Sequence, residues 1–197
     1  MPSKHQVNSD KWWDEMALIW KERGEVRDRP LEYEAVAKEI DCGPVAEVGM
    51  GFGTSVKYLN PEIQYIGFDI SDAMVTKSRE GYPDNIFVKA DIMKMSKSWE
   101  KAFAYSVVLQ TLEHFSPEDF KVVMKNLKRI TKKALIFSVP RGYPSNAERI
   151  SDGHLNGWKD EEELEKDFLQ YGCKIKFTEC NPNHIAGVLY YESDNCC

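Results

Sequence analysis

The segment VAEVGMGFGT, residues 45–54, constrains the possible folds more than any other part of the chain. It begins as a short, mostly apolar strand and continues into three glycines at alternate positions, Gly49, Gly51 and Gly53. Glycine permits positive φ angles and lets a ligand approach the backbone closely. The segment therefore predicts a buried strand, a tight turn and then a helix that reaches about Leu59. The turn either holds a ligand or simply connects the two elements.

Strand-like and helix-like stretches alternate along the chain, which predicts an α/β fold around a central sheet. The last two strands flank the turn Asn181-Pro182-Asn183, so we expect them to run antiparallel. The expected strands are 45–48, 65–68, 86–88, 105–109, 134–139, 174–178 and 185–191. The other expected helices are 9–23, one that begins at 30, 71–79, 117–130 and 160–171.

The composition fits one folded domain. The 197 residues are 42% hydrophobic and 12% aromatic, which is enough for a packed core, and the mean hydropathy of −0.51 argues against a membrane span. The net charge of −6 disfavours nucleic-acid binding, which needs a clustered basic face. The five cysteines form no CxxC pair and the polar N-terminus lacks a signal-peptide core, so we expect a reduced, cytoplasmic protein.

Asp69 lies 20 residues after Gly49, at the end of the next predicted strand. A carboxylate at this place in a βαβ unit reaches the hydroxyl pair of a ribose, although Asp69 also suits the N-cap of the following helix. The pattern departs from the dinucleotide fingerprint, because Thr54 takes the place of its third glycine. Glu47, just before the turn, would repel a pyrophosphate but suits a cationic amino acid. Together these residues predict a nucleoside-bearing cofactor other than a dinucleotide.

From Glu47 to Gly53 the chain resembles the first motif of the class I S-adenosylmethionine-dependent methyltransferases, an acidic residue, a hydrophobic residue and Gly-x-Gly-x-Gly. The resemblance continues through 67–71, 90–92 and 107–114, and it spans about residues 40–191. It implies S-adenosylmethionine as the cofactor. It also implies a Rossmann-like three-layer α/β/α sandwich, in which a seven-stranded sheet is mostly parallel and has an antiparallel C-terminal strand. Residues 42–197 would form this core, and residues 1–41 would form a helical lid or substrate segment.

The resemblance implies that the glycine turn holds the methionine part of the cofactor. Gly49, Met50, Gly51 and Gly53 would pass under it. Glu47 would organise this turn or meet the ammonium group, directly or through water.

The adenosine part would lie against the next two strand ends. Asp69 would hold the ribose hydroxyls, and Ile70 and Met74 would flank the adenine. Asp91 and Ile92 would meet the adenine amine and the ring face. The apolar residues among these can equally be core, and Asp91 can equally be a turn residue.

The end of the fourth predicted strand bears on the acceptor. Gln110 would lie beside the methyl group. The stretch 110–113 stands where enzymes that methylate exocyclic amines of bases or of glutamine usually carry Asn/Asp-Pro-Pro-aromatic. Leu112-Glu113-His114 instead resembles small-molecule methyltransferases, such as those of quinone biosynthesis. We therefore expect methyl transfer to an oxygen or nitrogen of a small molecule. The alternatives are a protein or RNA methyltransferase, a noncatalytic S-adenosylmethionine-binding partner subunit and, more distantly, an NAD-dependent oxidoreductase.

His154, His114 and Glu113 are the candidate catalytic residues. A histidine near its ordinary pKa can take a proton from a hydroxyl or an amine, but each histidine can equally be one that only binds backbone. Some relatives bind a metal ion through Glu-x-x-Glu-His and a later histidine. Gln110 stands here in the first of these positions, and a neutral amide is a poor ligand for a divalent ion. We therefore expect no metal site.

Aromatic and basic residues are the candidates for the acceptor wall. They either contact a small-molecule acceptor or belong to the core and to exposed loops, and the sequence leaves both open, as it leaves the oligomeric state open. They are Trp13, Trp20, Arg141, Tyr143 and Trp158.

Overall fold

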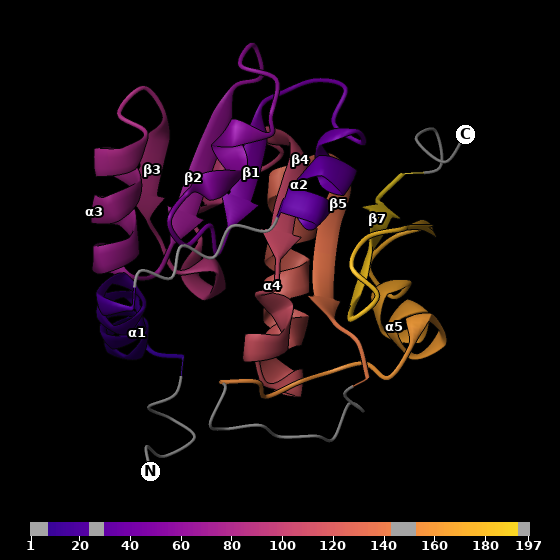
Figure 1. Ribbon diagram of the computed structural model, residues 1–197. Helices are drawn as coiled ribbons and strands as arrows, with labels where there is room; N and C mark the ends of the chain where they lie inside the picture. The colour runs from indigo at the N-terminus through magenta and orange to yellow at the C-terminus, as the bar shows by residue number, and fades with distance from the viewer. Residues whose placement is uncertain (1–7, 24–29, 143–152, 193–197) are drawn as a thin grey trace.

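The computed structural model describes residues 8–23, 30–142 and 153–192, and its N-terminal part contains two helices (Figure 1). The first, α1 (Asp10–Glu22), follows the N-cap Ser9, whose hydroxyl accepts a hydrogen bond from the backbone N–H of Trp12. The second, α2 (Pro30–Ala37), begins with a proline, whose missing N–H costs nothing in the first turn of a helix. Both helices agree with the sequence prediction.

A seven-stranded sheet follows these helices, in the order β3-β2-β1-β4-β5-β7-β6. The first five strands in the chain run parallel, whereas β7 is antiparallel to both of its neighbours, β5 and β6. This arrangement confirms the predicted sheet. The strands are β1 (Val45–Val48), β2 (Tyr65–Asp69), β3 (Ile86–Lys89), β4 (Phe103–Leu109), β5 (Thr131–Pro140), β6 (Lys174–Thr178) and β7 (His184–Tyr190).

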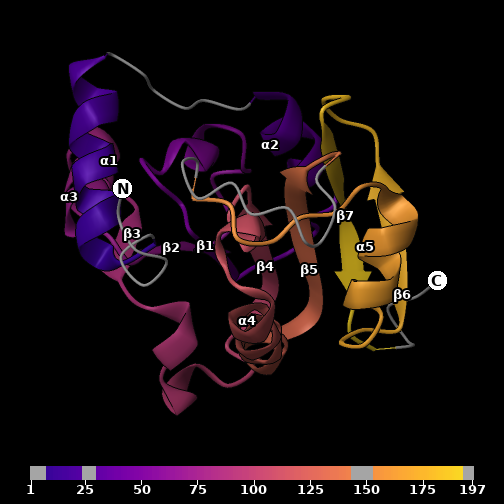
Figure 2. The same ribbon diagram turned by 90° about the horizontal axis from the view of Figure 1, so that it is seen from below.

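Helices cover both faces of the sheet. Along β5, Leu135, Phe137 and Val139 belong to the core under α4 and α5, whereas Ala134 and Ile136 belong to the core on the side of α2. Figure 2 shows α2 and α4 on opposite faces of the sheet, which gives the predicted three layers. The remaining α-helices are α3 (Asp72–Gly81), α4 (Pro117–Ile130) and α5 (Glu161–Phe168).

Several connections between strands contain short 3-10 helices, and one of these stands where a longer helix was predicted. A helix was expected from the glycine turn to about Leu59, but only η1 (Thr54–Lys57) forms there. Asn60 precedes Pro61, and the residue before a proline disfavours the helical conformation, so the chain has room for about one turn. The others are η2 (Ile92–Lys94), η3 (Lys97–Trp99) and η4 (Leu112–His114).

The strand order positions the site. The chain leaves β1 toward β2 and β3 on one side, and later continues through β4 and β5 on the other side. Ligands of open α/β sheets bind beyond the carboxyl ends of the strands where the order reverses in this way. The carboxyl ends of β1, β2 and β4 are therefore the expected site, and α1, which packs against α3, lies at the same end of the sheet (Figure 1).

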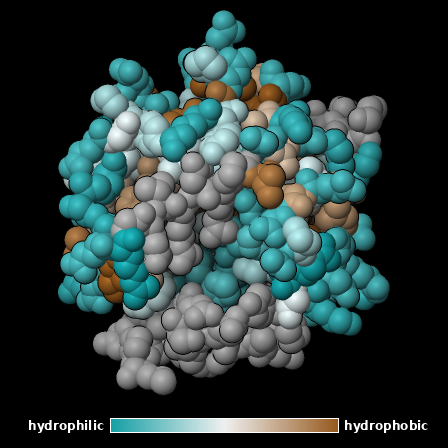
Figure 3. Space-filling view, viewed as in Figure 1, coloured by the Kyte–Doolittle hydropathy of each residue, from teal (hydrophilic) through white to brown (hydrophobic). Residues whose placement is uncertain are grey.

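The face seen in Figure 3 is mostly hydrophilic. Within the described part of the chain, no helix is both long enough and apolar enough to cross a membrane.

Candidate cofactor and acceptor site

A cavity of about 440 Å³ lies at the carboxyl ends of β1, β2 and β4, and α1 forms one of its walls. This volume lies within the usual range for pockets that bind small molecules and cofactors. Of the predicted cofactor residues, those that line the cavity are Gly49, Met50, Gly51, Asp69, Ile70, Met74, Asp91, Ile92 and Gln110. Gly53 does not line it, because it packs against Phe87.

The three glycines of the turn have φ angles of +73°, +57° and +70°, which side chains rarely tolerate. They nevertheless differ in what surrounds them. A Cβ on Gly49 would lie 2.4 Å from the Thr111 hydroxyl oxygen, whereas a Cβ on Gly51 would meet no atom within 4 Å. Gly51 therefore presents bare backbone to open space at the cavity wall, as a cradle for a ligand requires.

Asp69 is buried at the end of β2, and its carboxylate is fixed by the backbone. The N–H groups of Gly51 and Ser71 donate to its two oxygens at 3.0 and 2.9 Å. Burial raises the pKa of Asp69 to about 6, and the hydrogen bonds to the backbone oppose this shift. The carboxylate is mostly ionised at pH 7 and stands beside the glycine turn, where ribose hydroxyls could donate to it.

Asp91 is a turn residue that also reaches the cavity. It is the N-cap of η2, because its carboxylate accepts a hydrogen bond from the Met93 N–H at 2.9 Å, and it also lines the cavity. Ile70, Met74 and Ile92 give the same end of the cavity an apolar lining. A buried carboxylate, bare glycine backbone and this apolar end fit an adenosine bound through its ribose.

Glu47 does not line the cavity, whereas the next four residues, 48–51, do. It is buried, and its carboxylate accepts hydrogen bonds from the hydroxyls of Ser55 and of Tyr65, the latter at 2.6 Å. Burial raises the pKa of Glu47 to about 7. Its side chain thus connects β1 to η1 and β2, which corresponds to organising the turn and not to direct contact with the ammonium.

Tryptophans of α1 form part of the cavity wall. Both Trp13 and Trp20 line the cavity. The Trp13 ring contacts His114 edge-on, with centroids 4.8 Å apart, and Trp20 packs against Phe52 with centroids 6.4 Å apart. The N-terminal helix therefore connects the glycine turn to the end of β4.

Two predicted acceptor residues lie elsewhere, and a third falls outside the described residues. Trp158 is fully buried against Phe120 and Phe168, so it is a core residue. Arg141 does not line the cavity, and both of its terminal nitrogens bind the carboxylate of Glu161. Tyr143 is not among the described residues.

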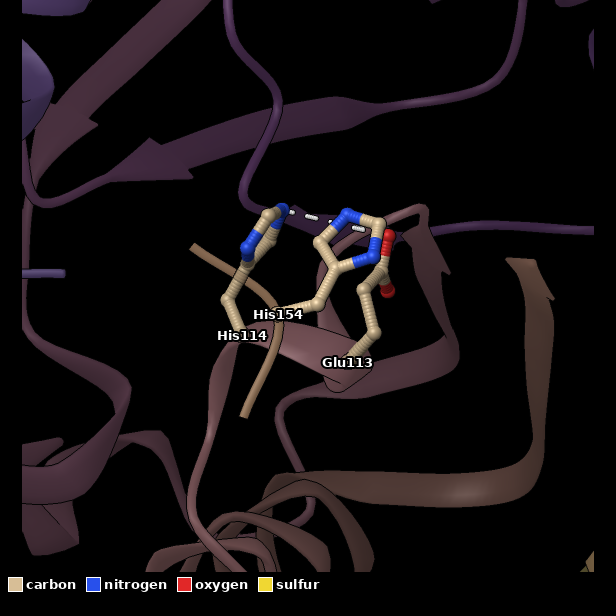
Figure 4. A group of neighbouring side chains, drawn as sticks. All are labelled: Glu113, His114 and His154. Atoms are coloured by element: carbon tan, nitrogen blue, oxygen red, sulfur yellow. Dashed lines mark ion pairs between the residues drawn. The ribbon is translucent and has the colours of Figure 1, made fainter. Parts of the chain in front are cut away.

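The three candidate catalytic residues lie together (Figure 4). Glu113 and His114 belong to η4, and His154 comes from the segment after β5. Each offers one ligand atom, and these atoms lie within 4.8 Å of one another. His114 and His154 line the cavity, whereas Glu113 is buried behind them with 2% of its side chain exposed. Such a group can handle a proton or hold a metal ion.

The sequence prediction missed several residues of the cavity wall. Asn8, Met16 and Tyr33 reach it from the N-terminal segment, and no local pattern marks them. Thr111 and Phe115 flank η4, and their positions next to Gln110 and His114 were a signal that could have identified them.

Comparisons with known proteins indicate which kind of domain contains this cavity. A family model described as a methyltransferase domain matches residues 45–134, which include the glycine turn, Asp69, Asp91 and η4. No curated protein matches the chain.

Solved structures show the same fold at low sequence identity. The [4+2]-cyclase SpnF is 17% identical with a TM-score of 0.73, and the match covers 92% of this chain and 78% of SpnF. Magnesium protoporphyrin IX methyltransferase of Synechocystis PCC 6803, with bound S-adenosylhomocysteine, is 14% identical with a TM-score of 0.56, and covers 93% and 83%. PH0226 of Pyrococcus horikoshii OT3 is 18% identical with a TM-score of 0.62, and covers 94% and 93%.

These neighbours include a cyclase, so the fold alone does not decide the activity. The methyltransferase-domain match lies on the segment that forms the glycine turn, the Asp69 carboxylate and the end of β4. The methyltransferase-domain match and the shared fold support a class I S-adenosylmethionine-dependent methyltransferase, with S-adenosylmethionine as its cofactor.

Proposed function

We propose that the protein transfers a methyl group to an oxygen or nitrogen of a small molecule bound between α1 and η4. One observation carries this proposal. A single cavity continues from the glycine turn and Asp69 to Trp13, His114 and His154, so a donor and a small acceptor would share one enclosure.

The chemistry asks mainly for positioning. S-adenosylmethionine supplies a methyl group on a positively charged sulfur. The acceptor's lone pair forms the new bond to the methyl carbon as the carbon–sulfur bond breaks, and the sulfur keeps that electron pair. The acceptor's proton leaves to water or to a nearby base. Gln110, whose amide donates to the Ser138 hydroxyl at 3.2 Å, and the aromatic wall would hold the reacting atoms in line.

Three features favour a small acceptor over a macromolecule. Residues of α1 form a wall of the cavity, so residues 1–41 would act as a lid and substrate segment on the core of 42–197. The net charge of −6 disfavours RNA, and the chain has the Leu112-Glu113-His114 sequence found in small-molecule enzymes. A cytoplasmic location remains part of the proposal.

The test has two stages. Isothermal titration with S-adenosylhomocysteine should give one binding site per chain. Transfer of labelled methyl from S-adenosylmethionine should then occur to members of a panel of small hydroxyl and amine compounds. Transfer only to peptides or RNA would contradict the proposed acceptor class. Binding without transfer to any acceptor would favour a noncatalytic subunit.

A further inference from the structure

Ser78 is a polar residue on the buried side of α3. Ser71, Met74 and Ser78 recur at helical spacing, and each is at most 2% exposed, so they share one buried face of this helix. Ser71 caps the helix and Met74 lines the cavity, but Ser78 has neither of these roles. A serine in the middle of a buried helix face is unfavourable unless its hydroxyl has a partner.

That partner is the glycine turn. The hydroxyl oxygen of Ser78 lies 3.0 Å from the carbonyl oxygen of Gly51 and 3.0 Å from that of Met74. A hydroxyl has one hydrogen to donate, and the carbonyl of Met74 lies inside α3, where the helix itself supplies a backbone N–H. The hydroxyl hydrogen is therefore available for the Gly51 carbonyl.

Gly51 is thus held on both sides by side chains. Its N–H donates to Asp69 at 3.0 Å, and its carbonyl accepts from Ser78 at 3.0 Å. It is also the glycine at which an added Cβ would meet no atom within 4 Å. Because glycine has wide conformational freedom, the orientation of this bare piece of backbone depends on the groups that bind it.

We infer that Ser78 is a positioning residue for S-adenosylmethionine. Its hydroxyl holds Gly51 in the orientation in which the Gly51 N–H fixes the Asp69 carboxylate, and Asp69 is the residue that we expect to hold the ribose. Ser78 does not line the cavity, so it acts through Gly51 and not by touching the cofactor. The inference concerns the cofactor part of the site and does not depend on the identity of the acceptor.

The size of the side chain matters as well as its hydroxyl. A Cβ on Gly53 would lie 3.2 Å from the Cβ of Ser78 and 2.8 Å from the Phe87 ring. The turn therefore approaches α3 closely, and position 78 favours a small residue. Alanine keeps this close approach and lacks the donor, so Ser78→Ala removes the hydrogen bond with little change in packing.

The experiment is isothermal titration of each variant with S-adenosylhomocysteine. In Ser78→Ala we expect the dissociation constant to rise about fivefold, which corresponds to the loss of one hydrogen bond. Ser106→Ala is the matched control, because Ser106 is equally buried on β4 and its hydroxyl bonds with that of Thr131, away from the cavity. It should lower the thermal stability about as much as Ser78→Ala does and leave the affinity unchanged.

A second pair of variants separates the hydroxyl from the size of the side chain. Threonine and valine have nearly the same branched shape, so Ser78→Thr and Ser78→Val share the cost of added bulk and differ in the hydroxyl. Ser78→Thr should bind S-adenosylhomocysteine more tightly than Ser78→Val, and this comparison carries the result if Ser78→Ala does not fold.

Three outcomes would overturn the positioning role. They are unchanged affinity in Ser78→Ala, an equal loss of affinity in Ser106→Ala, and equal affinities in Ser78→Thr and Ser78→Val. No acceptor enters these titrations, so a failure to methylate any small molecule would count against the proposed function alone.

Discussion

Asp14, on the N-terminal helix α1, accepts a hydrogen bond from the Ser71 hydroxyl at 2.5 Å. The same carboxylate oxygen accepts the backbone N–H of Ala73 at 3.0 Å. Ser71 is the N-cap of α3, and its own N–H donates to Asp69. The wall formed by α1 is therefore joined through one serine to the carboxylate that we expect to hold the cofactor ribose.

Removing this link should loosen α1 and weaken cofactor binding together. Asp14→Ala deletes two hydrogen bonds and the negative charge at the N-terminus of α3. This should weaken the packing of α1 on α3 by about 1 kcal/mol. We expect the dissociation constant of S-adenosylhomocysteine to rise about fivefold, as measured by calorimetry. Glu15→Ala changes an exposed neighbour on the same helix and should leave it unchanged. Equal effects of the two substitutions would contradict the link.

Asp69 should contribute more to cofactor affinity than any other acid at this end of the sheet. In Asp69→Asn, the amide nitrogen would face the N–H of either Gly51 or Ser71, so one donor would lose its partner and the turn would distort. We expect S-adenosylhomocysteine affinity to fall at least tenfold, equivalent to about 1.4 kcal/mol. Asp72→Asn is the control, since Asp72 is exposed and pairs only with Lys89 among the described residues. Unchanged affinity in Asp69→Asn would remove the ribose assignment.

The parts of the structure that local sequence determines were predictable. Helix α4 has the predicted bounds, Pro117–Ile130, because Ser116 caps it, Pro117 fits its first turn and its apolar residues recur at helical spacing. The glycine turn was predictable for the same reason, since positive φ angles at alternate positions require glycine.

Contacts between distant segments were not predictable from one sequence. The Asp14–Ser71 hydrogen bond joins residues 57 apart, and Asn8 donates to the Gly153 carbonyl across 145 residues. Nothing near Asn8 or Asp14 in the sequence distinguishes them from other polar residues of a helix start. Their roles depend on where the sheet places α1, which local patterns do not encode.

Glu47 should make the protein less stable as the pH rises. Its pKa in the folded protein is about 7, above the ordinary value of 4.5, because burial disfavours the charged form. Between these two values the folded state holds a proton that the unfolded state has lost, so the free energy of unfolding falls as pH rises from about 4.5 to 7. The loss from this group is about 3 kcal/mol as an upper bound.

Glu47→Gln isolates this effect, because an amide oxygen can still accept from Ser55 and Tyr65. Asp69 adds a pH dependence of the same sign, and the variant retains it. Denaturant unfolding at pH 5 and pH 8 should therefore show a smaller fall in stability for the variant than for the wild type. An equal fall in the free energy of unfolding for the two proteins would mean that Glu47 is already ionised at pH 5.

Trp158 and Trp13 should respond differently to substitution, although the sequence suggested the same role for both. Trp158 is fully buried and its Nε1 donates to Asp167 at 2.9 Å. Trp158→Phe loses this hydrogen bond and some packing, and should cost about 1–3 kcal/mol of unfolding free energy. Affinity for S-adenosylhomocysteine should stay unchanged in the folded fraction.

Trp13→Ala should have the opposite profile. The side chain is half-buried, lines the cavity and contacts His114, so its loss removes part of the acceptor wall. We expect slower methyl transfer and a higher KM for the acceptor, with S-adenosylhomocysteine binding reduced less than in Asp14→Ala. Measuring thermal unfolding and acceptor KM for both tryptophan variants separates the two roles. Similar acceptor KM values in Trp13→Ala and in the wild type would place the acceptor away from α1.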